Sequence, residues 1–265
     1  MLPSAMHAKA RYNTRMIRNV AHGGTRAWHR AHTRRVRRSW AIVASMVLVT
    51  LVFVASGYFS HVDWSTLGDA LLHSTYRLAF AYGIALLLGM GIALLVGSSV
   101  SLSEMLFPIF DVLQNIPSFA LIPIFIYFLG YTDEMIILFA VSSILWPILF
   151  AVLTAIRSAH TDLNDAATVF GATGFTRVRL YLTPLAFPAI LTGSIVGIAI
   201  GWESVIGAEI IANTSGFGAF IKGATGTGIT PATVAGMLAI LVLVFVINRL
   251  VWTPLLSEST KRYAE

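Results

Sequence analysis

The feature that most constrains this chain is a series of long apolar segments. A helix needs about 20 mostly apolar residues to cross the hydrocarbon core of a bilayer. Five segments meet this requirement: 40–59, 78–97, 135–156, 185–212 and 231–252. Only 11% of all residues are charged, against roughly a quarter in soluble domains. The sequence therefore predicts an all-α, polytopic membrane protein.

A sixth apolar segment, 105–130, is interrupted by polar and helix-breaking residues. It contains Asp111, Gln114, Asn115 and three prolines, of which Pro117 stands at its centre. Proline removes a helical hydrogen bond, and inside a membrane the freed backbone groups must find partners within the protein. We interpret the segment as one broken or kinked span, which gives about six spans. Five remain if the segment re-enters the membrane instead of crossing it.

Basic residues predict the orientation, because cytoplasmic loops carry an excess of Lys and Arg. With the N-terminus inside, sixteen Lys and Arg lie in inner segments and two, Arg77 and Lys222, lie in outer ones. Both termini are then cytoplasmic. The predicted outer loops are 61–76 and 213–230, and the long inner loop is 157–183.

The chain divides into a basic tail (1–39), a membrane domain (40–256) and a short cytoplasmic C-terminal tail (257–265). Ten of the eighteen Lys and Arg lie in the first 40 residues, which contain no Asp or Glu. A basic tail of this kind also fits a transit peptide or a segment that binds nucleic acid. We favour a disordered cytoplasmic tail that touches lipid headgroups, and no nucleic-acid partner.

The inner loop 157–183 has the pattern of two short amphipathic helices. Thr161 is a candidate N-cap, and Asp162 and Asp165 follow in the first turn, where the helix dipole favours anions. An apolar stripe at helical spacing comprises Leu163, Ala166, Ala167 and Phe170. Gly171 ends the first helix, and Thr173 or Thr176 caps the second, which carries Arg177. An amphipathic helix outside the bilayer needs a groove in which to lie.

This loop resembles the EAA loop of ABC-importer permeases. The match rests on Asp165-Ala166-Ala167, on Gly171 four positions later and on the end at Pro184. Asp165 replaces the family's Glu, Tyr181 its Ile and Thr183 its Leu. The resemblance implies a coupling helix that docks in a cleft of the ATPase subunit. The residues it assigns to this coupling are Asp165, Ala166, Ala167, Phe170, Gly171 and Arg177.

The resemblance extends over roughly residues 68–256. Within the family, the chain is similar to the permeases for nitrate, sulfonate, taurine and bicarbonate. This resemblance rests on residues 115–123 and 128–130, on the stretch 184–188, and on Trp202, Glu209 and the turn 216–218. It implies a multi-pass protein of the bacterial cell (inner) membrane. It also implies a homodimer, although a heterodimer with a second permease stays open. Two ATPase subunits and an extracytoplasmic solute-binding protein complete the implied complex, which works by alternating access on a small oxyanion, sulfonate or vitamin precursor. No cofactor is expected, since ATP would be bound by the partner subunit.

Polar residues in the apolar segments are candidates for a translocation path or gate. Glu203 and Glu209 lie six residues apart on one predicted helix, so they do not share a face. A carboxylate inside the membrane needs water or a protein partner. Each glutamate therefore either lines the translocation path or its gate, or anchors the structure. Asp111, Gln114, Asn115 and Pro117 line a path or form a solvated helix end. Gly193, Gly197 and Gly201 predict close helix packing.

Other functional classes fit less well. An ion-coupled secondary transporter also shows broken spans and buried carboxylates, but it does not need a loop of this kind. The chain has no cysteine, no phosphate-loop ending, no zincin His pair and no nucleophile elbow. The sequence therefore gives no catalytic residue and no metal site.

Overall fold

The computed structural model describes residues 57–60, 62–159, 161–226 and 230–263. The basic tail and residues 40–56 of the first predicted span lie outside the described residues. The chain divides into two compact units, Met1–Ser60 and His61–Glu265, and every helix considered below belongs to the second. In order these helices are α2 (Trp64–Gly97), α3 (Val100–Gln114), α4 (Ser118–Leu129), α5 (Asp133–Arg157), α6 (Thr161–Val169), α7 (Gly174–Arg177), the π-helix η1 (Val178–Leu182), α8 (Thr183–Ala212), α9 (Phe217–Thr225), α10 (Pro231–Ile247), the π-helix η2 (Asn248–Trp252) and α11 (Thr253–Tyr263).

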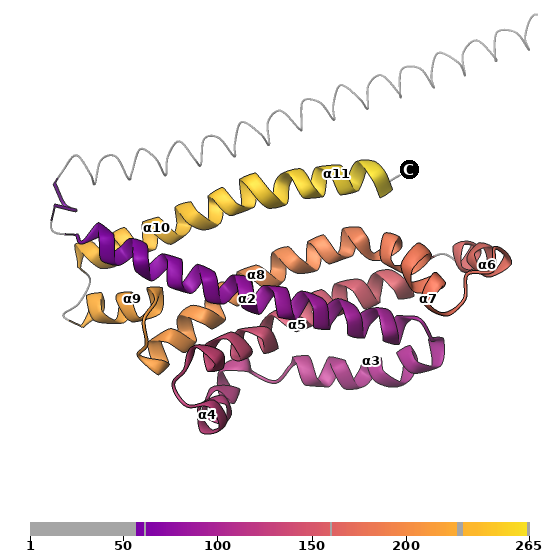
Figure 1. Ribbon diagram of the computed structural model, residues 1–265, viewed down its shortest axis with the longest axis horizontal. Coiled ribbons are helices and arrows are strands. Elements are labelled where there is room, and N and C mark those ends of the chain that lie inside the picture. The colour runs from indigo at the N-terminus through magenta and orange to yellow at the C-terminus, as the bar shows by residue number, and fades with distance from the viewer. Residues whose placement is uncertain (1–56, 61, 160, 227–229, 264–265) are drawn as a thin grey trace, which may run out of the picture. The chain divides into compact units, whose positions relative to one another are not determined.

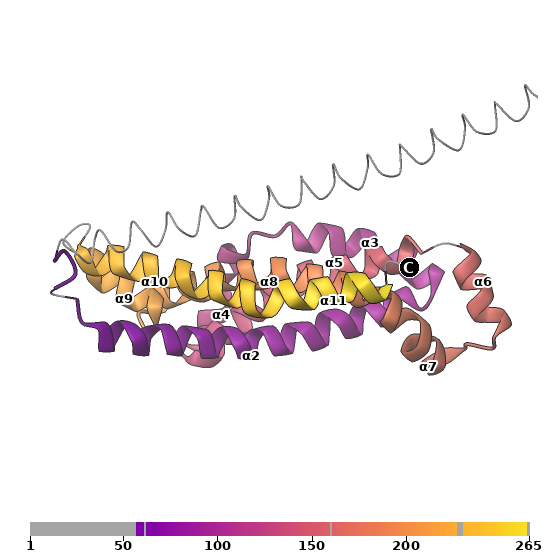
Figure 2. The same ribbon diagram turned by 90° about the horizontal axis from the view of Figure 1, so that it is seen from above.

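Helix α5 is the centre of the packing. It makes its most extensive contacts with α8 and α2, and α4 also packs against it (Figure 1). Its buried side chains include Met135, Phe139, Ile144 and Ile148. Viewed from above, α6 and α7 project together at one end of this helical unit (Figure 2). The predicted all-α architecture is confirmed.

The number of spans is confirmed only in part. Among the described residues, four helical stretches are long and apolar enough to cross a membrane: Trp64–Gly97, Asp133–Arg157, Gly174–Ala212 and Pro231–Ser259. Helices α3 and α4 together form a fifth candidate, bent by 87° at residues 115–117. The structure thus shows the predicted break but does not decide between a crossing and a re-entrant segment.

Helix α2 begins well before the start at residue 78 that hydropathy predicted. The Asp63 side chain caps it by accepting hydrogen bonds from the backbone N–H groups of Ser65 (3.1 Å) and Thr66 (3.2 Å). Hydrogen bonds from the Ser65 and Thr66 hydroxyls lower the pKa of Asp63 to about 2. Residues 64–76, which were predicted as part of an outer loop, are therefore helical, because an N-cap rather than hydropathy sets where a helix starts.

Two π-helical turns share one sequence pattern, Arg-Leu-x-x-Thr-Pro-Leu, at 179–185 and 249–255. In each, the threonine hydroxyl donates to the carbonyl five residues earlier: Thr183 to Val178 (2.8 Å) and Thr253 to Asn248 (3.0 Å). The proline that follows has no N–H, and the wider turn accommodates this loss without ending the helix. The helix therefore continues through the predicted C-terminal tail as far as Tyr263.

The predicted close packing at the three glycines of α8 is confirmed. A Cβ atom built on Gly193 would lie 2.9 Å from the Ala151 Cβ atom and 2.9 Å from the backbone of Pro147 and Ile148 on α5. Gly197 and Gly201 are similarly close to Ile144. Only glycine therefore lets α8 approach α5 at this distance.

Gly193→Ala is expected to destabilise the protein by about 1–3 kcal/mol, since the new methyl group meets backbone atoms that do not move easily. The matched control is Gly91→Ala on α2, where a Cβ meets nothing within 4 Å. It should be neutral or slightly stabilising, because alanine favours helix. Thermal unfolding in detergent measures both variants, and equal Tm values would contradict the packing argument.

Candidate functional site

The predicted loop helix is present as α6 (Thr161–Val169) and ends at the predicted glycine. Gly171 has φ +74°, and its N–H donates to the Thr168 carbonyl (3.0 Å). The next N–H, of Ala172, donates to the Ala167 carbonyl (2.9 Å). This pair of bonds is the Schellman arrangement, in which a glycine at the left-handed position closes the helix. Thr173 occupies the N-cap position of α7, although its side chain makes no capping bond.

Apolar side chains on and after α6 are unusually exposed. Val169 is 84% exposed, Phe170 88% and Phe175 78%. Asp165 and Ala166 are also exposed, and Ala167 is half-buried. Because large apolar side chains this exposed tend to mark interaction sites, the hairpin formed by α6 and α7 has the character of a docking element.

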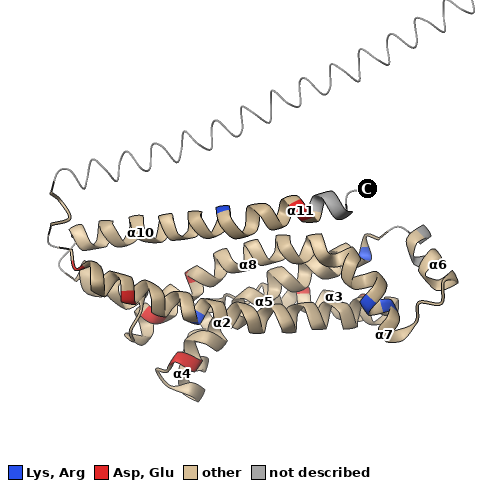
Figure 3. Cartoon of the chain, turned by 45° about the horizontal axis from the view of Figure 1, so that its top comes forward, with Lys and Arg blue, Asp and Glu red and all other residues tan. Residues whose placement is uncertain are grey.

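Several basic residues lie at the same end of the helical unit (Figure 3). Arg177 and Arg179 lie in α7 and η1. Arg157, at the end of α5, donates to the Ser103 carbonyl (3.3 Å), and its guanidinium lies 4.4 Å from the centre of the Phe107 ring. Arg157 thus joins α5 to α3, while Arg177 is half-buried at the end of the hairpin.

The break between α3 and α4 holds the polar residues that the sequence singled out. The Gln114 amide donates to the Asp111 carboxylate (2.8 Å), and the Asn115 amide donates to the Asp111 carbonyl (2.5 Å). Pro117 stands at the N-cap position of α4 without a side-chain capping bond. All four residues are exposed in the chain. Whether they line a translocation path stays a prediction.

A cavity of about 630 Å³ opens beside this break, between α3, α4, α5 and α8. Its walls are mainly apolar, with four neutral polar side chains, and charged residues are missing from its described lining. The polar members are Gln114, Ser118, Ser142 and Ser143. A volume of this size is typical of small-molecule sites.

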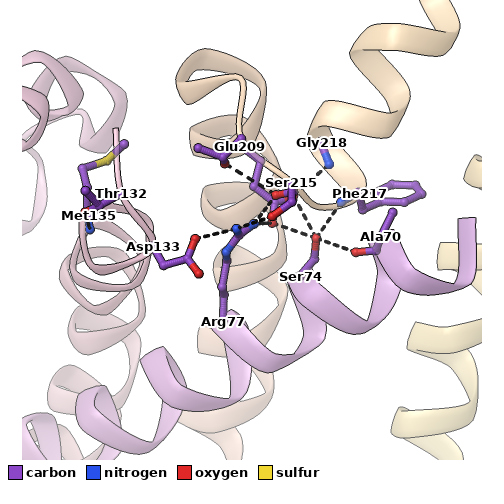
Figure 4. Close-up of polar contacts among 11 residues, drawn as sticks. Ala70, Ser74, Arg77, Thr132, Asp133, Met135, Glu209, Ser215, Phe217 and Gly218 are labelled. Carbon is purple, nitrogen blue, oxygen red and sulfur yellow. Dashed lines mark hydrogen bonds and ion pairs between the residues drawn. The ribbon is translucent and has the colours of Figure 1, made fainter. Parts of the chain in front are cut away.

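Glu203 and Glu209, on α8, face different surroundings. Glu203 is exposed and lies on the same helical face as Val196 and Ile200, which line the cavity. Glu209 is 0% exposed and points toward α2 and α9, as Figure 4 shows. The sequence argument that the two carboxylates occupy different faces is confirmed.

The partner of Glu209 is Arg77, which sequence analysis placed in an outer loop. Arg77 lies in the middle of α2 and is 1% exposed. Its Nη1 donates to the Glu209 carboxylate (2.5 Å) and to the Ser215 carbonyl, and its Nη2 donates to Asp133 (2.6 Å) (Figure 4). The guanidinium therefore joins α2 to α5, α8 and the turn before α9.

The carboxylate of Glu209 also organises the turn at 213–216. It accepts hydrogen bonds from the Ser74 hydroxyl (2.8 Å) and from the N–H of Gly218 (2.8 Å), while the Ser74 oxygen accepts from Phe217 N–H (2.8 Å). Gly216 has φ +125°, and a Cβ there would collide with the Glu209 and Arg77 side chains. The turn is thus folded directly onto the ion pair, which gives Glu209 the contacts of a structural anchor.

Sequence reasoning missed this pairing because 132 residues separate its members. The available signal was one unpaired basic residue beside an apolar segment and one acidic residue inside another. Inside a membrane, a charged side chain is stabilised when it pairs with a side chain of opposite charge.

Arg77→Met is expected to cost about 3–5 kcal/mol, because it leaves the buried Glu209 charge without its partner. Adding Glu209→Gln should recover part of this loss, and the double-mutant cycle measures the coupling. Glu203→Gln is the control for losing an exposed carboxylate on the same helix, and it should change Tm little. Additive losses in the cycle would show that the two side chains do not interact.

Residues 85–251 match the family described as "Binding-protein-dependent transport system inner membrane component". Similar proteins include the taurine transport system permease protein TauC of Escherichia coli, which is 28% identical over 69% of this chain and 67% of its own length. The nitrate import permease protein NrtB of Leptolyngbya laminosa is 26% identical over 67% of this chain and 64% of its own length.

A third relative transports a different kind of solute. The riboflavin transport system permease protein RibX of Chloroflexus aurantiacus is 32% identical over 49% of this chain and 48% of its own length. The matched region thus spans about half to two thirds of the length of each of these three relatives. The family model covers more than half of the chain, including the broken span, the hairpin and the buried ion pair's acidic partner. The chain belongs to the family of inner membrane components of binding-protein-dependent transport systems.

Proposed function

We propose that the chain is the permease subunit of an ATP-driven (ABC) importer for a small solute. The observation that carries this proposal is the exposed apolar hairpin of α6 and α7, closed by Gly171. The relatives are named as permeases for taurine, nitrate and riboflavin, which supports transport rather than an enzymatic reaction. The ATP-hydrolysing site would belong to a separate partner subunit.

The hairpin supplies what a docking site for an ATPase requires. Phe170 and Phe175 expose most of their surface, and an apolar side chain that enters a pocket of a partner contributes much of the binding energy at an interface. The small side chains of Ala166 and Ala167 allow the α6 backbone to approach a partner closely. The basic residues around α7 favour a cytoplasmic position for this end, where ATP is available.

The hairpin is connected to the membrane region without a break in the helix. Helices α7, η1 and α8 form one continuous stretch, Gly174–Ala212, with a length of roughly 58 Å at 1.5 Å per residue. A movement imposed on the hairpin therefore reaches Glu203 and Glu209 through a rigid element. A displacement of two such elements is the physical basis of alternating access.

The exposed surface of α8 supports assembly of two copies. One face of this helix is buried against α5 and α2. The opposite face is exposed and carries Thr192, Val196, Ala199 and Glu203. A carboxylate on such a face needs water or a protein partner inside a membrane. A homodimer that encloses a path between its subunits provides both. Two ATPase subunits and an extracytoplasmic solute-binding protein complete the proposed complex.

Ala167→Arg and Gly171→Pro are expected to uncouple ATP hydrolysis from transport. Arginine places a charge in the docking surface, and proline cannot adopt the positive φ of Gly171. A loss of about 3 kcal/mol in docking corresponds to more than a hundredfold weaker binding. Solute uptake should fall at least tenfold in proteoliposomes that contain the permease, its ATPase and its binding protein.

Ser257→Arg is the matched control, because it adds the same charge to an exposed position of α11 outside the hairpin. All variants should purify as folded protein, and Ala167→Arg and Ser257→Arg should leave Tm unchanged. Normal ATP-driven uptake in Ala167→Arg and Gly171→Pro would contradict the docking role. Uptake that needs no ATPase and follows an ion gradient would favour a secondary transporter.

The proposed orientation predicts which residues an impermeant thiol reagent reaches. The chain contains no cysteine, so a single introduced cysteine is labelled without background. In intact cells Lys222→Cys, on α9, should react, and Phe170→Cys should react only after the membrane is permeabilised. The opposite pattern would contradict the proposed orientation, because the hairpin would then lie outside the cell, where it could not contact a cytoplasmic ATPase.

A further inference from the structure

The cavity beside the broken span has an unusual charge environment for an importer of anions. No Lys or Arg occurs among the described residues that line it. Gln114, one of its polar members, donates to the Asp111 carboxylate at 2.8 Å. An anionic carboxylate therefore lies one hydrogen bond behind the cavity wall.

Glu203 brings a second carboxylate to the rim of the same cavity. Residues 196, 200, 203 and 207 fall on one face of α8, since the helix turns 100° per residue. Val196 and Ile200 line the cavity, and Gly207 lies against the ring of Phe119, next to Ser118 in the cavity wall. Glu203 stands between these two contacts and is exposed.

The helix ends at the break do not offset these charges. Helix α3 ends at Gln114 and α4 begins at Ser118, so the negative end of one dipole lies close to the positive end of the other. Each end is equivalent to about half an elementary charge, and the two contributions largely cancel. The carboxylates then set the sign of the potential in the cavity.

The apolar part of the wall has aromatic surfaces. Phe110 and Trp146 both line the cavity, and their ring centres lie 6.4 Å apart. Aromatic faces attract planar groups and cations through the negative potential above the ring. An oxyanion finds no cationic partner in the described lining, and the hydroxyls of Ser142 and Ser143 already donate to the Phe139 carbonyl.

We propose that this cavity, with Glu203 at its rim, selects neutral or cationic organic solutes that carry a planar or apolar part, and that it disfavours oxyanions. The inference deepens the proposed permease function and rests on it. It assigns to Glu203 the role of a charge-selecting residue in the path. Nitrate, the solute in the name of one relative, is an anion, so this chain would differ from that relative in what it transports.

The experiment uses the absence of native cysteine. Ile200→Cys places a thiol in the cavity one turn before Glu203. Its rate of modification is measured in membranes of the assembled transporter with two thiosulfonate reagents of similar size, one with a trimethylammonium group and one with a sulfonate group. Each rate is divided by the rate for a small free thiol, and the mass of the permease reports the modification.

The cationic reagent should react faster in this background. Adding Glu203→Gln should lower the cation-to-anion ratio by roughly fivefold, as expected for the loss of one nearby charge at intermediate dielectric. Glu203→Asp keeps the charge and should keep the ratio. Glu104→Gln removes an exposed carboxylate from the far end of α3 and should have no effect, and a thiol at Phe170→Cys should not respond to Glu203→Gln.

A ratio that stays within twofold after Glu203→Gln, or a preference for the sulfonate reagent, would overturn the proposal. A thiol at residue 200 that reacts with neither reagent would do the same, because an ion-selecting cavity must admit water. These outcomes do not test the proposed importer function, since the labelling needs no ATP hydrolysis. If the ratio depends on the charge of residue 203 but uptake is not driven by ATP, the proposed selectivity is supported and the proposed importer function is contradicted.

Discussion

The ion pair between Arg77 and Glu209 is the interaction on which the arrangement of the helices depends. It is buried between α2 and α8, and through Asp133 and Ser215 the same guanidinium reaches α5 and the turn before α9. Isolated charges in such a place would cost several kcal/mol each, whereas a paired and hydrogen-bonded set holds its partners in one geometry. Within the part of the chain that the structure describes, Glu203 has no such ion pair, and it is this carboxylate that we propose meets a solute.

The anchored end and the hairpin end of the helical unit are joined by the continuous stretch from α7 to α8. Close packing at Gly193, Gly197 and Gly201 ties this stretch to α5. A bundle held in this way transmits a displacement of the hairpin as a rigid movement, because well-packed interiors change between discrete arrangements and do not deform gradually. The cavity at the α3–α4 break lies against the same helix, so the proposed docking and the proposed passage of solute would share one mechanical element.

Local signals in the sequence predicted the hairpin and the close packing well. Gly171, Ala166 and Ala167 lie within a few residues of one another, and capping and helical periodicity act over that distance. The start of α2 was mispredicted because hydropathy reports the membrane boundary, while Asp63 sets the helix boundary. The pairing of Arg77 with Glu209 and the position of Glu203 beside the cavity depend on contacts between distant helices, which a single sequence does not encode in any local pattern.

The proposed coupling depends on docking of the α6–α7 hairpin on an ATPase subunit. A photoreactive amino acid incorporated in place of Phe170 tests it directly, because this side chain is 88% exposed at the tip of the hairpin. After illumination of native membranes, mass spectrometry identifies what the residue has captured. The account predicts one dominant adduct, to a cleft of a nucleotide-binding ATPase subunit. Capture of lipid alone, or of no partner, would contradict it.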